Sequence, residues 1–213
     1  VNSPLGVPAG PLLNGKWCLY YASLGFDVVT YKTVRSGFRE CYPLPNLVPV
    51  DTASLFGGEQ SVSQATTMDG SWAVSYGMPS QEPNAWQADI AETRQQLPSD
   101  KVLSVSIVGT VEPDWTLEQL AEDYALCARL AVESGADCIE ANFSCPNVST
   151  CDGQLFQNPA DCATVVKIIR EAIGHTPLIG KIGRLNNDAE SLELVQHLNG
   201  FVDALAMTNS IAT

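Results

Sequence analysis

Basic residues are scarce in this chain, and their scarcity excludes the class of partner that depends most on positive charge. Only 11 of the 213 residues are lysine or arginine, against 24 aspartates and glutamates, which gives a net charge of −13. Nucleic-acid binding requires lysines and arginines gathered on one face, and here they are scattered along the chain. We therefore expect no nucleic-acid partner.

Long apolar runs and paired cysteine motifs are also missing. No run of about 18 apolar residues occurs, and the start lacks a signal-peptide layout, so we expect no membrane partner. The seven cysteines form an odd set without a C-x-x-C pair, which argues against a disulfide framework and against a metal site. This pattern is typical of a reducing, cytoplasmic location. A chain that starts at Val1 and stops at Thr213, directly after a strand-like run, is typical of a piece of a longer protein.

Strand-like and helix-like segments alternate, most regularly in the second half. Thr116 and Gln119 form a capping box, Gly135 ends the helix that follows, and Asn158 with Pro159 opens the next one. The expected helices are 17–24, 116–135, 158–174 and 188–198. The expected strands are 5–10, 27–32, 102–108, 136–142, 178–182 and 204–208.

This alternation predicts a parallel sheet with right-handed crossovers. The fold class is α/β, and we interpret the chain as a (β/α)₈ TIM barrel truncated after about the sixth strand, in a single partial domain spanning 1–213. A six-stranded doubly wound sheet is the alternative, weakened because no G-x-G-x-x-G follows an early strand. The segment at about 35–98, rich in Pro, Gly, Ser and Thr, is expected to be a long loop or insertion over the active-site mouth.

Six residues, Asn142-Phe143-Ser144-Cys145-Pro146-Asn147, carry the strongest chemical signal. They follow the strand expected at 136–142, so two amides, a hydroxyl and a thiol lie at the strand's end. Amides can bind a polar planar ligand there, and a thiol can exchange a proton with it. A polar turn with an inert buried cysteine is the plainer alternative.

Polar residues follow the other expected strands as well. The strand ends are Ala9-Gly10, Lys32-Thr33, Gly109-Thr110, Asn142 to Asn147, Lys181 and Asn209-Ser210. In a barrel these ends meet on one rim, where two lysines and several amides indicate a binding site. Glu140 points to the same side as Asn142, and we expect it to be a structural partner of Lys181 or of another buried donor.

These motifs resemble the dihydroorotate dehydrogenase family, the FMN-containing barrels that include dihydropyrimidine dehydrogenases. The matching segments, in the family's order, are Ser3-Pro4-Leu5-Gly6, Ala9-Gly10-Pro11, Thr30-Tyr31-Lys32-Thr33, Tyr76-Gly77-Met78-Pro79, Ser106-Ile107-Val108-Gly109, Asn142 to Asn147, Gly180-Lys181 and Thr208-Asn209-Ser210. The resemblance spans nearly the whole chain and implies an FMN-binding domain that oxidises dihydroorotate to orotate in pyrimidine biosynthesis.

The resemblance also implies roles for individual residues. Cys145 would be the general base that takes the C5 proton while a hydride leaves C6 for flavin N5, and a cysteine at this place marks the class 1 branch. The implied substrate-binding residues are Asn142, Asn147, Asn209, Ser210, Lys32, Tyr76, Gly77 and Met78. The implied FMN-binding residues are Ala9, Gly10, Lys32, Thr33, Asn142 and Lys181. A homodimer is the family expectation, and an iron–sulfur electron-transfer subunit is a further partner that class 1 members use.

Two departures from the family pattern keep alternatives open. Val74 stands where the family has a substrate-binding asparagine, and Asn46 replaces a flavin-loop arginine. The first departure favours a dihydropyrimidine dehydrogenase-like enzyme that acts on dihydrouracil or thymine-type rings. A tRNA dihydrouridine synthase, against which the acidic charge speaks, and a non-catalytic barrel are the remaining hypotheses.

Overall fold

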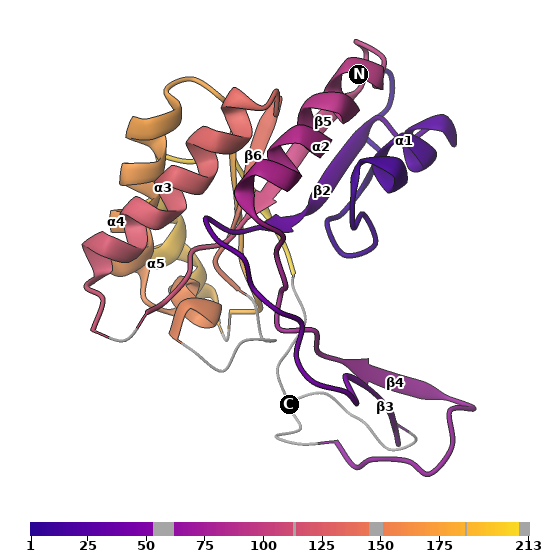
Figure 1. Cartoon of the computed structure of the whole chain (residues 1–213). Helices are drawn as coiled ribbons and strands as arrows, with labels where there is room; N and C mark the ends of the chain where they lie inside the picture. The colour runs from indigo at the N-terminus through magenta and orange to yellow at the C-terminus, as the bar shows by residue number, and fades with distance from the viewer. Residues whose placement is uncertain (53–61, 113, 145–150, 186, 209–213) are drawn as a thin grey trace.

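Six parallel strands form one curved sheet, in the order β1-β2-β5-β6-β7-β8 (Figure 1). The structure is a computed structural model that describes residues 1–52, 62–112, 114–144, 151–185 and 187–208. The strands of this sheet are β1 (Gly6–Val7), β2 (Val28–Val34), β5 (Val102–Ile107), β6 (Cys138–Asn142), β7 (Leu178–Lys181) and β8 (Ala204–Ala206). All six expected strands are confirmed, and the sheet has the form of a TIM barrel truncated after its sixth strand.

The helices cover the outer face of this sheet and connect its strands (Figure 1). They are α1 (Gly15–Ser23), α2 (Pro83–Gln96), α3 (Leu117–Glu133), α4 (Pro159–Ile173) and α5 (Asp188–Leu198), with a 3₁₀ segment η1 (Cys151–Gln157) before α4. The predicted capping box of Thr116 and Gln119 is present with both of its hydrogen bonds. Among the described residues, none of the helices combines the length and the apolarity needed to cross a membrane.

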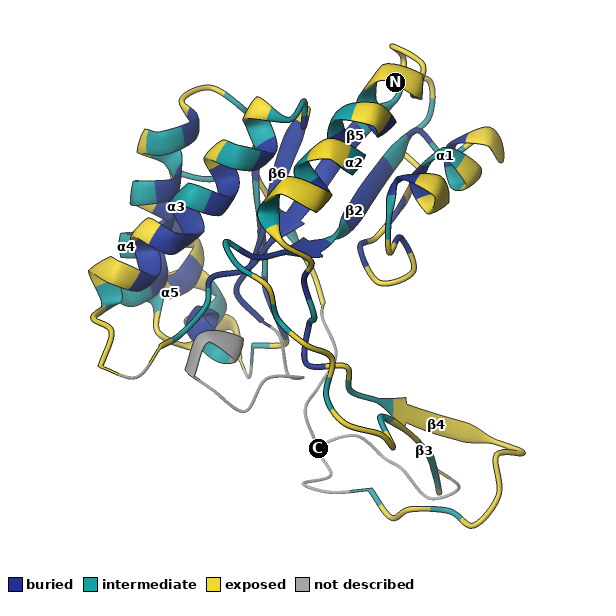
Figure 2. Cartoon of the chain, viewed as in Figure 1, coloured by how far each residue is buried: buried dark blue, intermediate teal, exposed yellow. Residues whose placement is uncertain are grey.

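The two faces of the sheet differ in chemistry because successive side chains of a strand point to opposite sides. Side chains on the outer face, such as Val29, Val105 and Ile139, are fully buried in the apolar core beneath the helices. Figure 2 shows that β2, β5 and β6 consist mainly of buried residues. The inner face buries mainly polar side chains, namely Thr30, Ser104, Ser106, Glu140 and Asn142, together with the Cys138 thiol. This polar lining leads to the carboxyl ends of the strands, where a TIM barrel places its chemistry.

The segment at 35–98 contains more regular structure than the long loop expected from the sequence. Strands β3 (Leu47–Val50) and β4 (Ser71–Val74) form an antiparallel pair that extends away from the main sheet (Figure 1), and α2 occupies the end of the segment. Pro83 begins α2, which buries only Trp86, Ile90 and Thr93. The other residues of this helix are mostly polar, and for this reason the composition of the segment predicts a loop.

Candidate active site

The carboxyl end of β6 holds Asn142 in a fixed position. Asn142 is only 3% exposed, and its backbone oxygen accepts a hydrogen bond from the Tyr124 hydroxyl at 2.9 Å. Its side-chain Oδ1 accepts a hydrogen bond from the Ser144 backbone N–H at 3.1 Å, and its Nδ2 lies 3.7 Å from Sδ of Met78. A ligand at this strand end would therefore meet an amide whose orientation is already set.

The two lysines predicted for the site lie on different strands of the same sheet: Lys181 ends β7 and Lys32 lies near the end of β2, with β5 and β6 between these strands. Lys181 pairs with Asn142 in the β6–β7 register, and its Nζ lies 3.6 Å from Oε1 of Glu140. This ion pair confirms the predicted structural role of Glu140, whose burial would be costly without a cation beside it. Lys32 donates from Nζ to the Gly10 carbonyl at 3.4 Å.

Small residues line the part of the mouth between these lysines and β1. Ala9 is buried, and a Cβ atom added at Gly10 would meet no heavy atom within 4 Å. Thr33 lies beside Ser106, with 3.0 Å between their hydroxyl oxygens. The backbone at Gly10 is therefore open to the approach of a flat ligand, and Thr33 is held against the neighbouring strand.

The stretch Tyr76-Gly77-Met78 has an unusual backbone. Gly77 has φ 73° and Met78 has φ 50°, so two successive residues adopt left-handed conformations. A Cβ on Gly77 would come within 2.6 Å of the Tyr42 ring, so only glycine fits there. Met78 contacts Asn142, so this stretch lies beside the end of β6. Both residues are predicted from the sequence to be parts of one substrate site, which requires them to lie close together.

Arg35 is a residue of the mouth that sequence reasoning missed. It follows β2 directly and is fully buried, with its guanidinium donating to the Met78 carbonyl at 3.2 Å and to the Gly109 carbonyl at 2.6 Å. Its backbone N–H donates to Ser80 Oγ at 3.1 Å, and its carbonyl accepts from Trp86 Nε1 at 3.1 Å. An arginine just past a predicted strand end, in a chain poor in basic residues, was the available signal.

Four predicted site residues lie outside the described residues. They are Cys145, Asn147, Asn209 and Ser210. The positions of these four residues stay predictions. Among the described residues, the structure brings together Asn142, Met78 and Lys181, and Arg35 joins Met78 to the end of β2.

The described cysteines offer no competing nucleophile in the core. Cys18, Cys127, Cys138 and Cys162 are buried without disulfides. Burial raises the pKa of the Cys138 thiol to about 11 and that of the Cys162 thiol to about 12. Such thiols stay protonated near neutral pH and pack as small apolar groups.

A cavity of about 850 Å³ lies beside the mouth, between the start of α1, the end of β2 and α2. Asp89, one of its lining residues, joins these elements. Asp89 Oδ2 accepts hydrogen bonds from the Tyr31 hydroxyl at 2.6 Å and from the Gly15 backbone N–H at 2.8 Å. Burial, together with this bond, raises the pKa of the Tyr31 hydroxyl. Asp89 is therefore a structural residue and not a candidate acid or base.

Comparison with known proteins identifies relatives by sequence and by fold. No family model matches the chain. A dihydroorotate dehydrogenase from Dictyostelium discoideum is 36% identical over 228 aligned positions, which cover 99% of this chain and 60% of that protein. The chain thus spans less than two thirds of the length of this curated relative.

Solved structures agree at the level of the fold. A crystal structure of DHODH from Eimeria tenella in complex with ferulenol matches with a TM-score of 0.73 and 16% identity, covering 98% of this chain and 57% of that one. The ligand-free form of the same enzyme matches with a TM-score of 0.70. The sequence relationship and the fold agree: the chain is similar to dihydroorotate dehydrogenases in both.

Proposed function

We propose that the protein to which this chain belongs is an FMN-dependent, class 1 dihydroorotate dehydrogenase that oxidises dihydroorotate to orotate. The observation that carries the proposal is the position of Asn142, whose amide is held at the carboxyl end of β6 three residues before Cys145 in sequence, in a chain 36% identical to a dihydroorotate dehydrogenase. Cytoplasmic location and a homodimer complete the proposal.

The residues at the mouth fit a flavin. Lys32 and Lys181 provide positive charge, the Gly10 backbone faces open space, and Thr33 offers a hydroxyl near the same strand end. Cations beside a flavin favour its anionic reduced form. When bound, FMN would accept the hydride that leaves C6 of the substrate. Ala9, Gly10, Lys32, Thr33, Asn142 and Lys181 are the residues that would hold it.

Substrate binding and proton transfer would come from the chain itself. Asn142, with Asn147, Asn209 and Ser210, would hydrogen-bond to the pyrimidine ring, and the backbone of Tyr76 to Met78 would bind its carboxylate. The Cys145 thiolate would accept the C5 proton. A thiolate is a competent base at neutral pH when nearby cations lower its pKa, and Lys32 and Lys181 are cations at strand ends of the same sheet.

Substitution of Cys145 tests the assignment of the base. In the intact, flavin-loaded protein, Cys145→Ser should slow reduction of the flavin by dihydroorotate by about 100-fold or more, because general bases contribute on this scale. Cys41→Ser, a change at an exposed cysteine, is the control and should leave the rate unchanged. Equal rates for Cys145→Ser and the control would remove Cys145 from the mechanism.

A second candidate function follows from Val74. This half-buried residue ends β4 and stands where the family has a substrate-binding asparagine. The absence of that asparagine favours a ring without the same polar contact, such as dihydrouracil. Val74→Asn should raise activity on dihydroorotate if the first proposal holds. No gain on dihydroorotate, combined with activity on dihydrouracil, would favour the second.

A further inference from the structure

Arg35 connects three parts of the mouth that are far apart in sequence. It follows the last residue of β2, and its guanidinium reaches the carbonyl of Met78 and the carbonyl of Gly109, the latter just past β5. The same nitrogen that contacts Gly109 lies 3.5 Å from the Thr110 hydroxyl. A planar guanidinium can hold several acceptors at fixed angles, which a lysine ammonium cannot do.

The backbone that Arg35 holds is strained. A methionine at φ 50° lies in the left-handed region, which is unfavourable for a non-glycine residue. Such a conformation persists only where surrounding contacts impose it. Here the contacts are Arg35 Nε on the Met78 carbonyl, the Tyr42 ring against Gly77, and the paired backbone bonds between Arg39 and Ser80 at 2.9 and 3.1 Å.

We propose that Arg35 is a positioning residue that sets the carboxylate-binding backbone of Tyr76 to Met78 against Asn142. This inference rests on the proposed function, in which that backbone binds the substrate's carboxylate. Through the Met78 carbonyl, Arg35 fixes the one residue of the stretch whose side chain contacts the Asn142 amide. Loss of Arg35 should therefore weaken the binding of ring ligands that carry a carboxylate more than the binding of those that lack one.

The experiment compares orotate with uracil, which share the pyrimidine ring and differ in the carboxylate. Dissociation constants for both are measured in the intact, flavin-loaded protein from the perturbation of flavin absorbance. Arg35→Met should weaken orotate binding about tenfold or more, equivalent to about 1.4 kcal/mol, and should weaken uracil binding less than about threefold. Arg35→Lys should weaken orotate binding by an intermediate factor, because the charge remains and the planar fork is lost.

Arg170→Met is the matched control. Arg170 also donates to backbone carbonyls, those of Phe201, Gly174 and Thr176, but it lies in the last turn of α4, at the opposite end of the strands. This variant should lower the melting temperature without changing the orotate-to-uracil affinity ratio. An Arg35→Met protein with an unchanged ratio would overturn the inference, and if that variant does not fold, an unchanged ratio in Arg35→Lys decides against it. Failure of the proposed function is seen separately, as no flavin reduction by dihydroorotate in the unsubstituted protein.

Discussion

Arg170, in the last turn of α4, forms an ion pair with Asp203, the residue before β8, with 2.6 Å between Nη2 and Oδ2. The same Asp203 oxygen accepts the backbone N–H of Leu178, at the start of β7, at 2.8 Å. The end of one helix, the start of the next strand and the start of the strand after it are thus joined by two side chains. This arrangement lies at the amino ends of the strands, away from the mouth.

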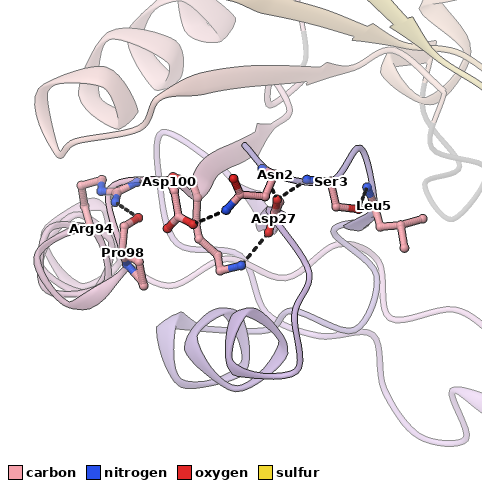
Figure 3. A network of polar contacts seen from close by, with 8 residues as sticks. Asn2, Ser3, Leu5, Asp27, Arg94, Pro98 and Asp100 are labelled. Atoms are coloured by element: carbon pink, nitrogen blue, oxygen red, sulfur yellow. Dashed lines mark hydrogen bonds and ion pairs between the residues drawn. The ribbon is translucent and has the colours of Figure 1, made fainter.

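The arrangement repeats two β/α units earlier. Arg94, in the last turn of α2, pairs with Asp137 before β6, and Asp137 Oδ2 accepts the Leu103 backbone N–H at 2.8 Å. Asp27, before β2, is a variant of it: Lys101 Nζ lies 2.6 Å from Asp27 Oδ1, and the backbone N–H groups of Asn2 and Ser3 donate to Oδ2 (Figure 3). At three places an aspartate directly before a strand therefore joins that strand to the start of a neighbouring strand or to the segment leading into it.

Replacing Arg170 should destabilise the protein. Arg170→Met removes one ion pair and hydrogen bonds to three carbonyls, and we expect the free energy of unfolding to fall by about 2 kcal/mol. Urea denaturation measures this change. Arg129→Met, at an exposed position on α3, is the control and should stay within about 0.5 kcal/mol of the parent. A midpoint for Arg170→Met equal to that of the control would show that the contacts add nothing.

Acid should reduce the contribution of Asp27, the aspartate before β2, to the stability of the fold. Hydrogen bonds from Lys101 and from the backbone N–H groups of Ser3 and Asn2 hold the pKa of Asp27 below its ordinary value of 3.8. A carboxyl whose pKa is lower in the folded state stabilises the fold above its unfolded pKa and loses this contribution as pH falls through the folded pKa. Asp27→Asn should therefore be less stable than the parent at pH 6, and the difference should shrink below about pH 5. Urea titrations across this range measure it, and a difference independent of pH would contradict the account.

The Tyr124 hydroxyl should stabilise the end of β6. Tyr124→Phe keeps the ring in the core but removes the bond to the Asn142 carbonyl, and we expect a loss of about 1 to 2 kcal/mol of unfolding free energy. Hydrogen exchange at the backbone amides of Phe143 and Ser144 should quicken in parallel. Tyr20→Phe, at an exposed tyrosine of α1, is the control. Unchanged exchange in Tyr124→Phe would mean that β6 is held by its strand pairing alone.

Gly109 should not tolerate a methyl group. A Cβ there would lie 2.6 Å from the Tyr124 ring and 2.7 Å from Leu120, both on α3. Gly109→Ala should cost about 1 to 3 kcal/mol of unfolding free energy through overpacking. Gly37→Ala, where a Cβ meets nothing within 4 Å, is the matched control and should be nearly neutral. Thermal unfolding of the two variants side by side separates these outcomes, and equal melting temperatures would refute the packing argument.

The sequence predicts the parallel sheet well because its strands are buried on both faces. The run 138–142 lies between α3 and α4, both of which have clear N-caps, and the run 102–107 precedes α3, so these strand positions follow from local signals. Strands β3 and β4 pair with each other and bury none of their side chains, so burial leaves no pattern in their sequence. Helix α2 was missed because Glu82 makes no side-chain cap bond and few of its residues are buried.

Part of the site was predicted because the positions of the strands follow from local signals. Asn142 and Lys181 are the last residues of their strands and Lys32 lies near the end of β2, so their common location follows from the topology of a parallel sheet. The partner of Lys181 was found because Glu140 and Asn142 alternate on one strand. The role of Arg35 was not found. Its place after a strand is visible in the sequence, but its role depends on contacts with Met78 and Gly109, 43 and 74 residues away along the chain, and no local pattern encodes such contacts.

Anaerobic reduction of the bound flavin tests the central claim most directly. The intact, flavin-loaded protein is mixed with dihydroorotate and, separately, with dihydrouracil, while the flavin absorbance is followed. The account predicts rapid bleaching by dihydroorotate and little by dihydrouracil. Bleaching by dihydrouracil alone, or by neither compound, would contradict the proposed dihydroorotate dehydrogenase activity.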